Sequence, residues 1–273
     1  MKMLSLEPKK RSKIRVFIGK KYYNLRRRVY WMFGKINFAK EKDSKPYIHE
    51  YFSHRTPLLR RLKDVDMYLQ HNKITNLKLA VPKINDIIIK PGETFSYWNL
   101  IGKPTRRKGY KDGMILFSGT FKPGIGGGLC QLSNLIYWMV IHTPLTVTER
   151  YRHSYDVFPD SSRTQPFGSG ATCVYNYRDL MIRNDTSQPY QLKVWLTDTE
   201  LCGSIRVNSK PCEFYKVYEK EHSMNKELFG KYSRHNVIFR KVYDIHNRVI
   251  ADEYVTENHA LMMYEPFLEY KQE

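Results

Sequence analysis

Apolar residues recur along this chain in patterns that predict both helices and strands. The segment from Leu129 to His142 is apolar almost all round, which predicts a helix buried in the core. Pro144 ends that helix. The short apolar run 86–89 is followed by Pro91-Gly92 and predicts a buried strand. Helical spacing is also expected in the two segments that precede this strand, 58–69 and 74–85.

Strand-like patterns dominate the rest of the chain. They occupy 145–158, 171–183 and 190–197, and alternation of apolar and polar residues persists beyond Cys202 as a predicted β-hairpin extension. The sequence therefore predicts an α+β fold, in which a buried helix packs on a mostly antiparallel sheet with a β-hairpin extension at the C-terminus. We divide the chain into three parts: a basic aromatic N-terminal arm (1–45), a central module (46–200), and a β-rich C-terminal extension with a tail (201–273).

Composition supports a folded globular protein and narrows its class. The chain has 273 residues, 41% of them hydrophobic, which is enough to form a sizeable core. No run approaches the roughly 18–20 consecutive apolar residues that span a bilayer, and no apolar segment of a secretory signal follows the first lysines. We therefore expect a cytoplasmic protein, with a peripheral position at the inner membrane face as one alternative. Four irregularly spaced cysteines fit free thiols.

Positive charge is concentrated at the N-terminus. Residues 1–40 hold 13 Lys and Arg against the single acid Glu7, which gives 12 of the net charge of +19. Aromatic residues are interleaved with these charges. Two interpretations remain open: the aromatics dock on the module while the charges face water, or residues 1–40 bind an anionic membrane surface. The chain lacks a recognition helix, an RNA-binding signature and a zinc-knuckle spacing, so nucleic acid is not an expected partner.

The run from Gly124 to Asn134 is the strongest candidate for chemistry. Three glycines, Gly126 to Gly128, precede the predicted buried helix, and Cys130 lies in its first turn. Glycine lets the backbone approach a ligand closely, and the free amides of a first helical turn favour a negative charge. We therefore expect a lowered pKa for the Cys130 thiol, and an oxyanion hole at the amides of Cys130 and Gln131. Ser133 and Asn134 share the face of Cys130.

A cysteine nucleophile needs a base, and the base needs an orienting group. His153 is the predicted base and Asp179 the predicted orienter. The residues expected to contact substrate are Gly126, Gly127, Gly128, Gln131, Ser133, Asn134, Arg150 and Ser154. Two other interpretations stay open: His153 and its neighbouring arginines form a ligand-binding cluster without catalysis, or the glycine–cysteine turn is only tight packing. No metal-ligand spacing and no nucleotide loop is present, so neither a metal nor a cofactor is expected.

Several ordered motifs resemble the VanW family, which is named for an accessory protein of vancomycin-resistance clusters. The resemblance covers about residues 74–200 and rests on six groups of residues: Pro91–Ser96, Gly109-Tyr110, Gly126–Gln131, Glu149-Arg150, His153-Ser154, and Asp179-Leu180 with Arg183-Asn184. It implies a bacterial protein linked to the cell envelope and glycopeptide resistance. It also implies peptidoglycan, its stem peptide or a precursor as the ligand.

This chain departs from the family at one position. Where the family usually has an aspartate, the chain has Gly170. If that aspartate belonged to a triad, Asp179 would have to replace it, or the site would be a dyad or only a binder. The sequence therefore predicts a VanW-like accessory protein of glycopeptide resistance or cell-envelope maintenance. It leaves open a cysteine-dependent amide or acyl-transfer enzyme and a non-catalytic binder of a cell-wall precursor or of a partner resistance protein.

Overall fold

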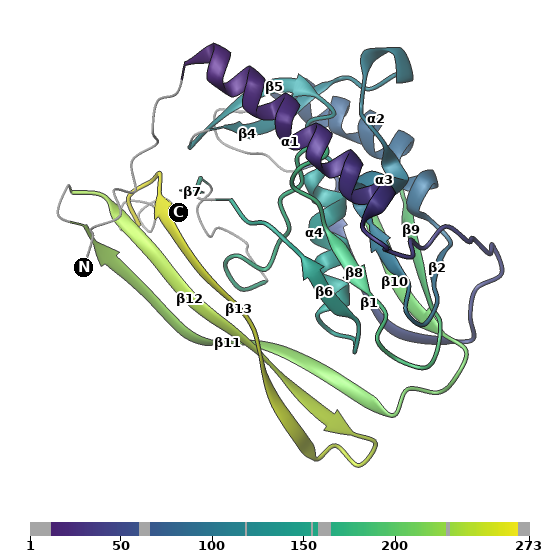
Figure 1. The fold of residues 1–273 in the computed structure, drawn as a ribbon. Coiled ribbons are helices and arrows are strands. Elements are labelled where there is room, and N and C mark those ends of the chain that lie inside the picture. Colours follow the sequence, from purple (N-terminus) through teal and green to yellow (C-terminus); the bar gives the residue numbers. More distant parts are fainter. Residues whose placement is uncertain are drawn as a thin grey trace.

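A computed structural model describes residues 12–59, 66–117, 119–153, 155–157, 165–227 and 230–266. Helices and mostly antiparallel strands form separate layers, so the predicted α+β class is confirmed (Figure 1).

The central sheet joins strands that lie far apart in the sequence. Its order is β1, β10, β9, β2, all antiparallel, with bounds His49–Pro57, Glu200–Val207, Tyr190–Leu196 and Ile87–Ile89. The predicted strand at 86–89 is therefore confirmed. β10 begins at Glu200, where we placed the boundary between the central module and the C-terminal extension. This strand nevertheless belongs to the central sheet.

Two helices pack on the central sheet. α2 (Met67–Ile84) contacts β9, and α4 (Cys130–Val140) contacts β1 and β10. The predicted buried helix is confirmed, because all its residues from Leu135 to Val140 are buried. The helix predicted over 58–69 is wrong at its start, since residues 58 and 59 are not helical; residues 60–65 lie outside the described part, and α2 begins at Met67.

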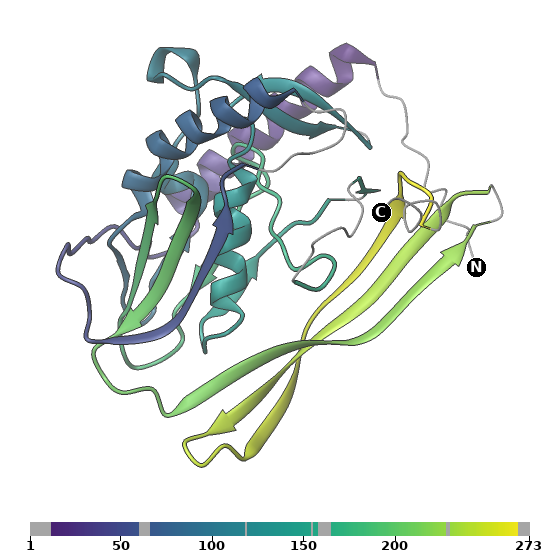
Figure 2. The same cartoon turned by 180° about the vertical axis from the view of Figure 1, so that it is seen from behind.

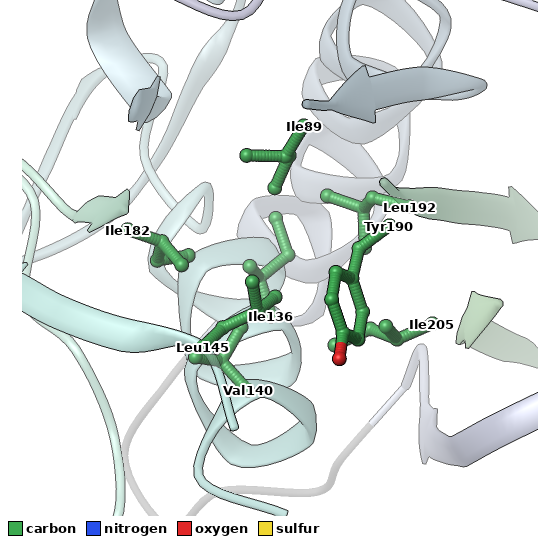
Figure 3. Close-up of a pocket in the computed structure, with 8 residues that line it drawn as sticks. All are labelled: Ile89, Ile136, Val140, Leu145, Ile182, Tyr190, Leu192 and Ile205. Atoms are coloured by element: carbon green, nitrogen blue, oxygen red, sulfur yellow. The ribbon is translucent and has the colours of Figure 1, made fainter. Parts of the chain in front are cut away.

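α4 also faces a small second sheet. That sheet has the order β3, β8, β6, with bounds Thr94–Ser96, Met181–Arg183 and Thr146–Glu149. A cavity of about 10 Å³ lies where α4 meets both sheets, and Figure 3 shows its lining side chains: Ile89, Ile136, Val140, Leu145, Ile182, Tyr190, Leu192 and Ile205. Such a volume holds at most one water molecule, and its lining is almost entirely apolar, so it is a packing void rather than a ligand site.

Short elements connect these layers. α3 (Tyr97–Ile101) follows β3 directly, and a single 3-10 turn occupies Arg106–Lys108. A hairpin of β4 (Asp112–Phe117) and β5 (Thr120–Ile125) then leads into α4.

The C-terminal extension is a sheet of long strands beside the module in both views (Figures 1 and 2). Its order is β11, β12, β13, β7, with bounds Glu213–Lys226, Tyr232–Asp244, Val249–Met262 and Tyr155–Asp156. The expected hairpin is thus a three-stranded antiparallel meander, with β7 added in parallel at its edge. β13 continues to Met262, so the C-terminal extension is a strand up to that residue.

The N-terminal arm contains one long helix, α1 (Lys13–Phe33). Ser12 caps it by accepting a hydrogen bond from the amide of Arg15 at 3.3 Å. The part of the expected arm before Ser12 lies outside the described residues. α1 is in front of the other elements in Figure 1 and is among the faintest elements in the reverse view of Figure 2, so it lies on an outer face.

Candidate functional site

The glycine run is held by close contacts inside the protein. A Cβ on Gly127 would lie 2.1 Å from the carbonyl carbon of Gly113, and one on Gly128 would lie 2.2 Å from a side-chain carbon of Lys73. Gly128 also has a φ of +88°, which side chains disfavour. The side chain of Asn76, wholly buried, donates a hydrogen bond to the carbonyl of Gly127 at 2.9 Å. The space that a Cβ would need at these two glycines is therefore filled by β4 and α2.

Cys130 is the first residue of α4 and is partly buried. Its thiol donates a hydrogen bond to the carbonyl of Cys173 at a sulfur–oxygen distance of 3.8 Å. Burial raises the pKa of this thiol, whereas we expected the helix N-terminus to lower it. That expectation is wrong because burial disfavours the charged thiolate. The thiol is therefore the neutral form at physiological pH.

The polar strip beside Cys130 binds the same backbone segment. Ser133 donates to the carbonyl of Ala171 at 2.7 Å, and the Asn134 side-chain oxygen accepts from the amide of Ala171 at 2.8 Å. Together with Cys130, these side chains hold the segment from 171 to 173 along the first turns of α4. Gln131 points elsewhere and donates to Thr56 and to the carbonyl of Pro57, each at 2.9 Å.

Gly170, the departure from the family pattern, borders this contact. A Cβ there would lie 2.6 Å from the side-chain oxygen of Asn134, and the Gly170 carbonyl accepts from Arg150 at 2.9 Å. Arg150 also donates to the carbonyl of Gly168 and lies 4.7 Å from the ring centroid of Tyr137. Its donors are thus used to hold the turn before segment 171–173.

Asp179 is wholly buried and organises the start of α3. Its carboxylate accepts from the Ser96 hydroxyl at 2.5 Å and from the amides of Trp98 and Leu180 at 2.9 Å each. Burial nevertheless raises the pKa of Asp179 from 3.8 to about 7. Among the described residues, no hydrogen bond or ion pair joins its carboxylate to His153.

His153 lies instead among arginines. Burial, together with the charge of Arg178, lowers the pKa of His153 to about 4, so its ring is neutral at pH 7. Arg152 donates to the carbonyl of His153 at 3.3 Å, and burial followed by repulsion from Arg150 lowers the pKa of Arg152. We call Arg150, Arg152, His153 and Arg178 the arginine–histidine cluster. Among the described residues, the ring of His153 has no hydrogen bond to Cys130. Ser154 lies outside the described residues.

Within the part of the chain that the structure describes, none of the three arginines of the cluster forms an ion pair with a carboxylate. The nearby acid Glu149 is bound by Arg27 of α1 through both carboxylate oxygens, one of them at 2.7 Å. Glu257 attracts Arg152 electrostatically without an ion pair. The sequence analysis identified Arg150 and His153 as site residues and offered the arginines beside His153 as a ligand-binding cluster. It did not identify Arg178, although this residue adjoins the predicted orienter Asp179.

Comparison with known proteins assigns the region that contains these residues. A family model described as "VanW like protein" matches residues 72–206. These residues therefore form a VanW-family region. The resemblance read from the motifs is therefore confirmed, and Cys130, His153 and Asp179 all fall inside the VanW region.

Two curated relatives are similar in sequence to this chain. Vancomycin B-type resistance protein VanW of Enterococcus faecalis is 39% identical over 167 residues, which cover 61% of each chain. The uncharacterized protein YoaR of Bacillus subtilis is 32% identical over 118 residues, which cover 43% of this chain and 37% of YoaR. The aligned part is thus less than two thirds of either relative's length. No solved structure matches this chain.

Two further properties of the described residues bear on the site. They contain no group of three or more His, Cys, Asp or Glu side chains that could hold a metal ion. None of their helices combines the length and the apolar character needed to cross a membrane.

Proposed function

We propose that this chain is a VanW-type accessory protein of glycopeptide resistance that binds a carboxylate-bearing cell-wall peptide or precursor. Its relationship to the Enterococcus faecalis resistance protein supports the first part. The second part depends on one observation: within the described residues, Arg152 and Arg178 of the arginine–histidine cluster form no ion pair with a carboxylate.

The chemistry of the cluster suits an anionic ligand. The planar guanidinium of arginine matches a carboxylate in two parallel hydrogen bonds, and partial burial strengthens the attraction because water screens it less. Arg178 also lies 5.7 Å from the ring centroid of Tyr151, which is 38% exposed. An exposed aromatic ring beside Arg178 can contact the apolar part of a peptide while the guanidinium group binds its carboxylate.

The environment of Cys130 supports binding in preference to catalysis. Its thiol is neutral, its hydrogen bond goes to the Cys173 carbonyl, and the predicted orienter Asp179 spends its oxygens on Ser96 and two backbone amides. A nucleophile needs an ionised sulfur and a base within reach.

Titration of the purified protein with a synthetic cell-wall precursor pentapeptide, followed by calorimetry, tests this function. We expect binding by the wild type and losses of roughly tenfold or more in Arg152→Gln and in Arg178→Gln, because each removes a charged hydrogen-bond donor. Arg107→Gln is the control, since Arg107 is an exposed arginine in the 3-10 turn. Circular dichroism checks that all three variants remain folded.

Mass spectrometry of the same mixtures separates binding from catalysis. We expect the peptide mass to stay unchanged. A wild-type protein that ignores the peptide, or cluster variants that bind it with full affinity, would overturn the proposed function. Consumption of the peptide by the wild type but not by Cys130→Ala would establish the cysteine enzyme instead.

A further inference from the structure

The inner face of α1 fixes this helix on the module. Arg27 pairs with Glu149 of β6, and both side chains are largely buried, at 10% and 18% exposure. Asn24 accepts a hydrogen bond from the amide of Asn176 at 3.2 Å, and Trp31 packs against the core. These residues recur at helical spacing, so one side of α1 packs against the module. The opposite side therefore faces away from the module.

The outer face of α1 is apolar, which is unusual for a solvent-facing helix surface. We call it the outer stripe. Its members are each between 44% and 73% exposed: Ile14, Phe17, Ile18, Tyr22, Leu25, Val29, Met32 and Phe33. At about 100° per residue they share one side of a helix of about 30 Å. A group of exposed apolar side chains along one side of a helix marks an interaction site.

Charge decides which partner fits the outer stripe. Exposed basic residues border the outer stripe: by helical spacing Lys21 and Arg28 lie along one edge, and Arg15 and Arg26 lie along the other. Lys13 and Lys20 are also exposed but lie nearer the inner face, and α1 contains no acid. A second copy of this helix would bring two sets of like charges together, which disfavours a dimer through this face. An anionic bilayer accepts the apolar side chains at its acyl boundary and attracts the basic side chains to its headgroups.

We propose that α1 lies flat on an anionic lipid bilayer, with the outer stripe inserted and the basic residues at the headgroups. The position of α1 on an outer face of the molecule leaves this surface accessible (Figures 1 and 2). The inner face keeps its contacts with Glu149 and Asn176, so the bilayer carries the whole module. The interaction is peripheral and reversible, and it does not depend on the cell-wall ligand proposed above.

Sedimentation of the full chain with vesicles tests this surface. Binding is compared on pure phosphatidylcholine and on a 3:1 mixture of phosphatidylcholine and phosphatidylglycerol. We expect strong partition only to the anionic vesicles, weakened by 1 M salt because salt screens the charges. The triple variant Leu25→Ser/Val29→Ser/Met32→Ser should partition at least about tenfold less, because it removes inserted apolar surface.

Matched variants exclude general effects of lost hydrophobicity or charge. Ile245→Ser/Val249→Ser/Ile250→Ser removes three aliphatic side chains of 52% to 64% exposure near the turn between β12 and β13, and it should bind like the wild type. Arg26→Gln/Arg28→Gln should lose about fivefold per charge. Lys210→Gln/Lys216→Gln, with the same charge change on exposed residues elsewhere, should lose little.

Three results would overturn the proposal. The first is a wild-type chain that does not sediment with anionic vesicles. The second is an outer-stripe variant that binds as well as the wild type while the unfolding midpoints of both agree. The third is a dimer in analytical ultracentrifugation that the outer-stripe variant dissolves, which would identify a second copy of the chain as the occupant of this face.

Discussion

Replacing Asp179 by asparagine tests the balance of forces on a wholly buried acid. Three hydrogen bonds and the charge of Arg27 favour the ionised carboxylate, yet burial outweighs them and raises its pKa to about 7. Asparagine has nearly the same shape. Its oxygen can accept from the amides of Trp98 and Leu180, and its NH₂ group can donate to the hydroxyl of Ser96.

The raised pKa fixes both the sign and the size of the effect. The folded protein holds a proton on Asp179 between pH 3.8 and about 7 while the unfolded chain does not, so stability falls as the pH rises through this window. A change from pH 5 to pH 8 covers about two pH units of this window. At 1.36 kcal/mol per unit, the free energy of unfolding of the wild type should fall by about 3 kcal/mol. Asp179→Asn has no such contribution. Its free energy of unfolding relative to the wild type should therefore rise by about 3 kcal/mol between these pH values.

Urea unfolding of both proteins at pH 5, 6.5 and 8, followed by tryptophan fluorescence, measures this difference. Burial lowers the pKa of His142 and of His153 to about 4. The stability that these two groups contribute to the folded protein is therefore lost as the pH falls from 6.5 to 4. Both histidines are present in each protein, and the comparison cancels them. Ser96→Ala, which removes a donor to the carboxylate, should be destabilised more at pH 8 than at pH 5. A constant difference between Asp179→Asn and the wild type would refute the reasoning, because the folded carboxylate would then be ionised throughout.

Three other substitutions or reagents test the contacts around the site. Arg27→Met leaves the Glu149 carboxylate without its partner, so it should lower the free energy of unfolding in urea by about 2–4 kcal/mol and speed proteolysis within α1. The control Arg28→Met changes an exposed residue and should alter neither the stability nor the proteolysis. Equal effects of the two variants would contradict the contact of α1 with the module. Iodoacetamide at pH 8 should modify the exposed Cys212 before Cys130, as followed by peptide mass spectrometry, and the reverse order would show an activated thiol. Gly127→Ala places a Cβ against the facing backbone of β4 and should lower the free energy of unfolding by more than about 3 kcal/mol. A variant that unfolds at the same urea concentration as the wild type would contradict this packing.

Elements with a strong local pattern could be predicted from the sequence, and elements without one could not. β2 is buried throughout and α4 is buried from Leu135 to Val140, so their apolar runs identify them. β1 was not predicted. It lies at the edge of the central sheet, and its nine residues, with several charged or polar side chains, alternate between half-buried and exposed. Long-range pairing with β10 stabilises this strand, and a sequence window contains no information on that partner.

The same distinction applies to the candidate site. The glycine run shows where the backbone has no room for side chains, but not that Gly113 and Lys73 fill the space. The position of Cys130 at a helix start was correct. Its pKa could not be derived from that position, because desolvation depends on the tertiary packing around the thiol, including segment 171–173.

α1 lies between the surface that we propose to bind lipid and the arginine–histidine cluster. The charges of Arg26 and Arg27 act on Tyr151, the ring that Arg178 also faces. Arg27 in addition neutralises Glu149, which otherwise repels a carboxylate ligand. If both proposals hold, Arg27→Met should weaken peptide binding and vesicle binding together, because it exposes an anion beside the cluster and releases the helix. The outer-stripe variant should weaken vesicle binding alone. A loss of peptide affinity in the outer-stripe variant as well would mean that the stripe contacts the ligand, and that lipid is not its occupant.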